Sequence, residues 1–110
     1  MENFKRPWTG YVNHMIRLFI TNTEVFPVKR DADGRVLNQA DVTNWLSVQH
    51  QFFHLTPGEQ EIVREVYGGG SDPLPVRVNR YADKIGADEK VVWGVIQRFS
   101  KAVAKDRGLI

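Results

Sequence analysis

The segment 81–96, YADKIGADEKVVWGVI, constrains the fold of this chain more than any other part of the sequence. It joins two runs of helical periodicity through Gly86, which lacks a Cβ atom and can adopt the left-handed conformation that ends a helix. Ala82 lies four residues before this glycine and the branched Val92 lies six residues after it. A small residue, a glycine and a branched residue at this spacing are typical of a helix-turn-helix. The segment therefore predicts two helices packed around a tight turn.

Such a helix pair has two interpretations. It often presents its second helix to the major groove of DNA, but many all-helical proteins use the same corner only to pack their core. Residues 1–70 contain seven Lys or Arg and eight Asp or Glu, whereas residues 71–110 contain eight and five. Positive charge is concentrated in the part that carries the motif, as contact with DNA phosphates requires. Because the excess is modest, we expect a monomer to bind weakly.

Apolar residues recur at helical spacing along most of the chain, which predicts an all-α fold of about five helices. Thr56 and Glu59 have the spacing of a capping box, and Asp88 is placed to cap the last helix. A small β-hairpin is compatible with residues 28–37, because turn residues lie there between short apolar runs. The expected helices cover residues 8–22, 39–55, 57–67, 76–85 and 88–105.

The apolar stripes of these helices also predict the core. Most of the expected core residues are aromatic or branched, and Ile85 is expected to face inward at the end of the fourth helix. The stripes of the first, second and fifth helices comprise Trp8, Tyr11, Val12, Met15, Ile16, Phe19, Val42, Trp45, Leu46, Gln49, Phe52, Phe53, Val91, Val92, Val95, Ile96, Phe99 and Val103.

The length of 110 residues fits one compact domain, and its 42% apolar residues suffice for a core. Within it we distinguish an N-terminal helical part, 1–55, from a helix-turn-helix part, 56–110. The glycines and prolines of 68–75 are interpreted as a long interhelical loop, with a hinge as the alternative. The chain has no cysteine, no signal-peptide pattern and no run of about 20 apolar residues. We therefore expect a cytoplasmic protein without a membrane partner.

The residues expected to meet DNA lie on the last two helices. Lys90 has the chemistry to contact guanine, and Gln97 has the chemistry to pair with adenine. Trp93, beside Gly94, suits either DNA or packing in the core or against a second subunit. Acidic Asp88 and Glu89 oppose dense phosphate contact at that end. Two rows of cations flank the motif, and each is also explained as a solvated helix face: Arg77, Arg80 and Lys84 on the fourth helix, and Arg98, Lys101 and Lys105 on the fifth.

The sequence gives little support for metal binding or catalysis. His50 and His54 have the spacing of two zinc ligands on a helix, but Gln51 stands where a general-base glutamate would follow His50. We expect these histidines to border the core or to pair with carboxylates. No nucleophile motif, phosphate loop or cysteine is present. The sequence thus predicts no enzyme, no metal site and no cofactor.

With 55–67 and 81–107 taken together, the second half of the chain resembles region 4 of bacterial sigma factors. The run LTPGEQEIVREVY at 55–67 is similar to the leading helix of that family, and YADKIG at 81–86 is similar to its first motif helix and turn. The whole chain is similar to small phage and prophage late-transcription regulators of the ArpU and RinA type. The resemblance covers about half of the chain, and residues 1–54 match only in their general helical style.

The resemblance implies a transcription regulator that contacts promoter or operator double-stranded DNA through the second motif helix, at Lys90, Trp93, Gly94, Gln97 and Arg98. No region for melting promoter DNA is present, so the resemblance does not extend to a complete sigma factor. The alternative is a helical protein–protein adaptor that docks on RNA polymerase or serves phage packaging or assembly. A homodimer would suit either function, because operators are often two-fold.

Overall fold

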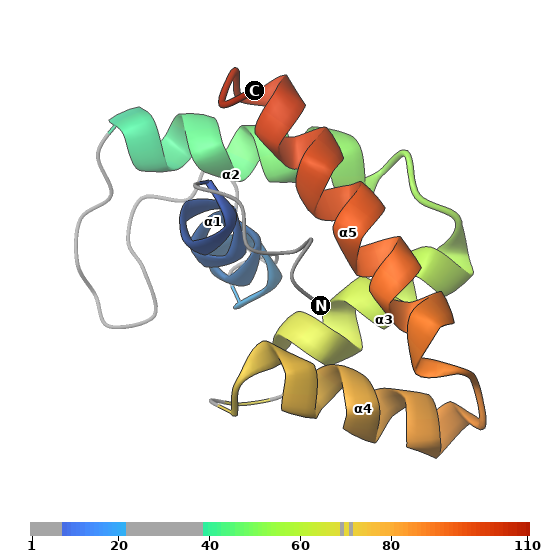
Figure 1. Ribbon diagram of the computed structural model, residues 1–110. Helices are drawn as coiled ribbons and strands as arrows, with labels where there is room; N and C mark the ends of the chain where they lie inside the picture. The colour runs from blue at the N-terminus through green and yellow to red at the C-terminus, as the bar shows by residue number, and fades with distance from the viewer. Residues whose placement is uncertain (1–7, 22–38, 69, 71) are drawn as a thin grey trace.

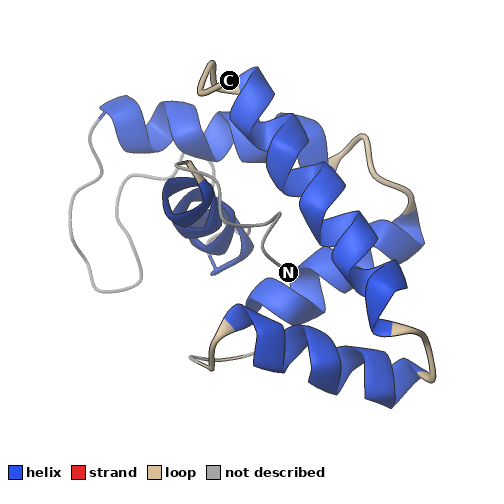
Figure 2. Ribbon diagram, in the orientation of Figure 1, coloured by secondary structure: helices blue, strands red, loops and turns tan. Residues whose placement is uncertain are grey.

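The computed structural model describes residues 8–21, 39–68, 70 and 72–110, and every regular element in these ranges is an α-helix (Figure 1, Figure 2). The predicted all-α fold of five helices is confirmed, although individual helix ends differ from the expected ones by up to three residues. The β-hairpin considered for 28–37 lies outside the described residues. The helices are α1 (Thr9–Thr21), α2 (Gln39–Phe52), α3 (Pro57–Gly68), α4 (Leu74–Ile85) and α5 (Glu89–Asp106).

Helix α5 lies at the centre of this arrangement. It packs against all four other helices, and Figure 1 shows it running from the end of α4, past α3, to the end of α2. Its Phe99 is 1% exposed and meets the ring of Phe52, with ring centroids 6.3 Å apart. All five helices contribute side chains to one apolar cluster, so both expected parts of the chain share a core. None of the helices in the described ranges combines the length and apolar character needed to cross a bilayer.

Local capping chemistry decides where α3 begins. The backbone N–H of Thr56 donates to Glu59 Oε1 at 3.0 Å, and the backbone N–H of Glu59 donates to Thr56 Oγ1 at 3.2 Å. This reciprocal pair is the capping box predicted from the sequence. It satisfies two backbone donors that the first turn of a helix would otherwise leave without partners.

A buried polar cluster joins three helices. Tyr67 of α3 is 2% exposed, and its hydroxyl donates to Asn13 Oδ1 of α1 at 2.9 Å. The same oxygen lies 3.2 Å from Ser100 Oγ of α5. Burial raises the pKa of Tyr67 well above its ordinary value, although Ser100 and Arg77 act in the opposite direction. The hydroxyl is therefore neutral and holds three elements in register.

Five residues expected in the core are exposed, and the prediction was wrong for them. Leu46 and Val91 are each adjacent in sequence to buried Trp45 and Val92, so the 100° turn per residue carries their side chains outward. Phe53 follows the last residue of α2 and therefore leaves the helical stripe. Ile85 ends α4 beside the turn. The hydroxyl of Tyr11 in α1 accepts a hydrogen bond from Asn44 Nδ2 at 2.7 Å at the edge of the core. The exposed fractions are Tyr11 43%, Leu46 39%, Phe53 67%, Ile85 47% and Val91 57%.

Candidate nucleic-acid interface

The glycine-turned helix pair is present at the predicted position. Gly86 follows α4 with φ 69° and ψ 30°, in the left-handed region. The backbone N–H of Ala87 donates to the carbonyl oxygen of Ala82 at 3.0 Å, which closes the end of α4. Asp88 then caps α5, because its Oδ1 accepts the backbone N–H of Lys90 at 2.8 Å. Three residues thus separate the two helices and turn the chain sharply.

The outward side of α5 carries a row of cations. At 3.6 residues per turn, five positions along 90–105 fall within about 80° of arc and span about 22 Å. Between 90 and 105 the helix contains no Asp or Glu. We call this row the basic face of α5, and its members are Lys90, Gly94, Arg98, Lys101 and Lys105.

All four cations of the basic face are exposed, and three of them have no carboxylate partner in the part of the chain that the structure describes. The exception is Arg98, whose Nη2 lies 3.2 Å from Glu59 Oε2. Gly94 has no side chain, so the surface is shallow in the middle of the face. The space around it is open, because a Cβ atom built there meets nothing within 4 Å. The face therefore combines positive charge with room for a close approach.

The acidic residues at the two ends of α5 are engaged within the protein. Asp88 caps the helix, and Glu89 Oε2 accepts a hydrogen bond from Asn79 Nδ2 at 3.0 Å. Asp106, at the other end, contacts His50 and Gln51 of α2. These contacts hold the carboxylates at the helix ends, away from the middle of the basic face.

Two residues expected to read DNA bases do not lie on the basic face. Trp93 is 6% exposed and belongs to the apolar cluster, which matches the packing alternative considered for it. Gln97 is half-buried, and its Nε2 is enclosed without a hydrogen-bond partner in the described part of the chain. Helix α5 packs on four neighbours, so its buried arc covers about 180° and takes in Trp93.

The cation row of α4 is largely occupied by contacts within the protein. Arg77 is half-buried, and its Nη1 donates to the carbonyl oxygens of Val66 at 2.9 Å and of Tyr67 at 3.1 Å. These are carbonyls of the last turn of α3, which have no partner within that helix. Arg80 Nη2 lies 2.6 Å from Asp72 Oδ2, and Lys84 Nζ lies 3.2 Å from Glu65 Oε1. The row is therefore less available to phosphate than the sequence suggested.

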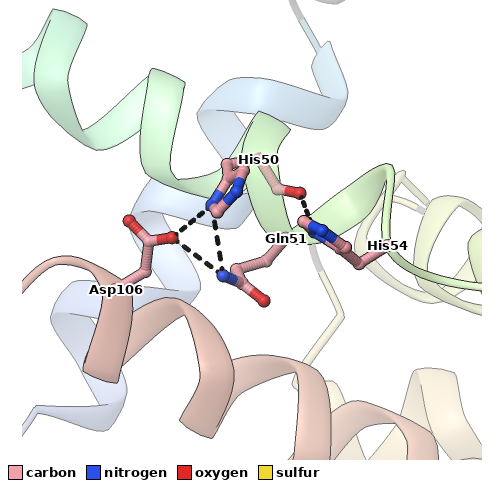
Figure 3. A network of polar contacts seen from close by, with 4 residues as sticks. All are labelled: His50, Gln51, His54 and Asp106. Carbon is pink, nitrogen blue, oxygen red and sulfur yellow. Dashed lines mark hydrogen bonds and ion pairs between the residues drawn. The ribbon is translucent and has the colours of Figure 1, made fainter.

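His50 of α2 contacts a carboxylate, and His54, in the turn that follows α2, contacts His50 (Figure 3). His50 Nδ1 lies 2.6 Å from Asp106 Oδ2, and Gln51 Nε2 donates to the same oxygen at 2.8 Å. Partial burial of Asp106 opposes its ionisation, but hydrogen bonds from Gln51 and His50 outweigh it, so the pKa of Asp106 is lowered. His54 Nδ1 contacts the carbonyl oxygen of His50 at 2.8 Å. This network fastens the end of α2 to the end of α5.

The described residues contain no group of three or more His, Cys, Asp or Glu side chains arranged to hold a metal ion.

The sequence analysis did not identify Arg17 of α1, which lies beside Arg77 in the fold and lines a pocket with it. Its only signal was that it interrupts the apolar run from Met15 to Ile20.

No protein-family model, curated protein or solved structure matches this chain. The resemblance to sigma region 4 and to phage late-transcription regulators therefore stays an expectation from the residues of 55–67 and 81–107. The structure shows where each of those residues lies in the fold.

Proposed function

We propose that the protein is a DNA-binding transcription regulator of phage or prophage origin that places α5 in the major groove of double-stranded DNA. The observation that supports this most is the basic face of α5, which directly follows the glycine-closed turn. The major groove is about 12 Å wide and admits an α-helix. Exposed Lys101 and Lys105 suit phosphate contact, while Lys90 in the first turn is placed to reach base edges.

The proposal depends on the basic face and not on the whole set of residues expected from the sequence. Trp93 contributes through packing that fixes the angle of α5, and Arg77 through its bonds to the end of α3. Gly94 admits a DNA strand close to the helix axis. The recognition surface is therefore narrow, and with the modest net charge of the chain it supports the expectation that a monomer binds DNA weakly.

The test is a fluorescence-anisotropy titration of a 30-base-pair duplex of random sequence at 50 to 200 mM salt. Non-specific binders have dissociation constants of roughly 10⁻⁴ to 10⁻⁶ M at physiological salt, and log K falls linearly with log salt. The variant Lys90→Glu/Lys101→Glu/Lys105→Glu should lose binding at least 100-fold. The matched control is Arg80→Glu/Lys84→Glu, which reverses two cations that are already paired with carboxylates.

Equal losses in the two variants would show that net charge, and not the basic face, controls binding. Absence of salt-dependent binding by the natural protein would refute the proposal. Sedimentation at increasing protein concentration, with and without duplex, tests the homodimer that a two-fold operator would require.

A second candidate function, a helical protein–protein adaptor, is favoured by one observation. Ile85 and Val91 are exposed on either side of the turn, where an apolar pair can enter a partner's groove. RNA polymerase or a phage packaging component would be such a partner. In that case Ile85→Ser/Val91→Ser should abolish RNA polymerase capture, and the lysine-to-glutamate triple variant should leave it intact.

A further inference from the structure

We propose that a pocket between α1 and α4 binds a single phosphate group, held between the side chains of Arg17 and Arg77. The pocket lies where α1 passes the end of α3 and the start of α4, apart from the basic face of α5. Its volume is about 160 Å³, and the residues that line it are Asn13, His14, Arg17, Tyr67, Leu74 and Arg77.

The described residues that line the pocket supply hydrogen-bond donors, and none of them is a carboxylate. Arg17 is exposed, and its guanidinium has no partner in the described part of the chain. Asn13 accepts the hydroxyl of Tyr67 through its oxygen, at 2.9 Å, which leaves its amide N–H groups available. A site rich in donors and without acidic groups selects an oxyanion.

Arg77 contributes a fixed donor to this pocket. Its Nη1 is bonded to the carbonyl oxygens of Val66 and Tyr67, so the guanidinium is held in place before any ligand arrives. Its Nε is buried and has no hydrogen-bond partner in the described ranges. A buried donor without a partner is costly, and an anion in the pocket would supply an acceptor.

The two arginines also repel one another. Burial lowers the pKa of Arg77 most, and the neighbouring charge of Arg17 lowers it further. An ion with two negative charges between the guanidinium groups would replace this repulsion with two attractions. The planar guanidinium of arginine can donate two parallel hydrogen bonds to a phosphate group, so it matches the phosphate oxygens better than a lysine ammonium does.

A second pocket that also has Arg77 in its lining provides an internal comparison. It also measures about 160 Å³ and is lined by Glu65, Arg77, Arg80, Tyr81 and Lys84. There Glu65 contributes a negative charge and pairs with Lys84, while Arg80 pairs with Asp72. The pocket beside Arg17 has neither feature, so it is the one that favours an anion.

The phosphate group has two candidate sources, a small phosphate ester or the backbone of a DNA strand. The second source rests on the proposed function, whereas the site itself does not. Both share the same tetrahedral oxyanion, so inorganic phosphate is the probe for the first experiment.

In that experiment, backbone amide shifts of the full chain are followed by NMR during addition of sodium phosphate, with sodium chloride adjusted to constant ionic strength. We expect saturable shifts at residues 13–17, 74, 76 and 77. Arg17→Gln should weaken phosphate binding at least tenfold, and Arg17→Lys should retain part of it. Arg64→Gln removes an exposed cation that lies outside both the pocket and the basic face of α5, and this variant should bind phosphate like the natural protein.

Shifts that increase without saturation, or equal binding by the natural protein and Arg17→Gln, would overturn the proposal. Once saturable binding is seen, titration of the random duplex identifies the source. A strand phosphate predicts that Arg17→Gln reduces the salt slope by about 0.9, and a small phosphate ester predicts an unchanged slope. If the protein binds no DNA, the proposed function fails while the phosphate titration still decides the site.

Discussion

The backbone N–H of Ala87 donates a hydrogen bond to the carbonyl oxygen of Ala82 at 3.0 Å, across the turn that joins α4 to α5. The bond forms only because Gly86, between them, has φ 69° and ψ 30°. A residue with a Cβ atom pays about 1–2 kcal/mol in this conformation. The direction in which α5 leaves the turn, and hence the direction of its basic face, depends on this one position.

Gly86→Ala should therefore lower the free energy of unfolding by about 1 kcal/mol, measured by urea denaturation. Gly94→Ala is the matched control, because Gly94 is inside α5 and a Cβ atom there meets nothing within 4 Å. The control should raise stability by about 0.5–1 kcal/mol, since alanine favours helix over glycine. If both variants change the free energy of unfolding in the same direction, the left-handed conformation at Gly86 does not explain the effect of its substitution.

Glu59 should make stability depend on pH. Its pKa is lowered, chiefly by the hydrogen bond from the Thr56 backbone N–H, with partial burial acting against this and Arg98 supporting it. The unfolded chain thus binds more protons here than the folded chain as pH falls. The stability from Glu59 is complete above its ordinary pKa of 4.5 and is lost as pH falls through the lower folded value.

Glu59→Gln tests this relation, because glutamine also serves in a capping box but does not titrate. Urea denaturation at pH 7 and pH 3 should show a smaller loss of stability in the variant than in the natural protein. Asp106, whose pKa is also lowered, adds a loss of the same sign in both proteins. An identical acid loss in both would exclude Glu59 as a contributor.

The features that the sequence predicted well are those whose chemistry is local. Gly86, Asp88 and the Thr56–Glu59 pair act on backbone groups within a few residues, so their neighbours in the sequence determine what they do. The same holds for the five helices, whose apolar spacing reflects their own period.

The features that the sequence predicted poorly depend on how helices meet. Arg77 looked like one member of a cation row, but its role is set by the end of α3, which approaches it only in the folded chain. For Trp93 the sequence left DNA contact and packing as alternatives, because it lies off the narrow apolar stripe. Helix α5 has four neighbours and buries a wider arc, which includes Trp93. Arg17 lies near Arg77 only because α1 packs close to α4 in the folded chain, and the sequence does not show this packing.

Arg77 and Arg80 should therefore respond differently to the same substitution. Arg77→Gln removes charged hydrogen bonds to the carbonyls of Val66 and Tyr67 and should cost about 1.5 kcal/mol of stability. Arg80→Gln breaks an exposed ion pair with Asp72, and we expect no measurable change. Thermal or urea denaturation distinguishes the two, and equal effects would contradict the capping role of Arg77.

The buried hydroxyl of Tyr67 should contribute measurably to the free energy of unfolding, because it contacts side chains of two other helices. Tyr67→Phe keeps the ring but leaves Asn13 Oδ1 and Ser100 Oγ without this partner, at a cost of about 1–3 kcal/mol. In the double variant with Ser100→Ala, the two losses should not add, because both remove the same contact. Strict additivity in a urea-denaturation cycle would show that the two hydroxyls act independently.

Lys101 gives the sharpest test of the basic face. It is exposed, has no carboxylate partner in the described part of the chain and lies midway between Arg98 and Lys105. If it contacts a phosphate, Lys101→Gln should reduce the slope of log K against log salt by about 0.9 and weaken binding to all duplexes alike. Lys84→Gln, which removes a cation already paired with Glu65, should reduce the slope less. Circular dichroism should show unchanged helix content in both variants, since neither side chain is buried. A larger effect at Lys84 than at Lys101 would place the DNA on α4 and would reverse the assignment of the binding helix.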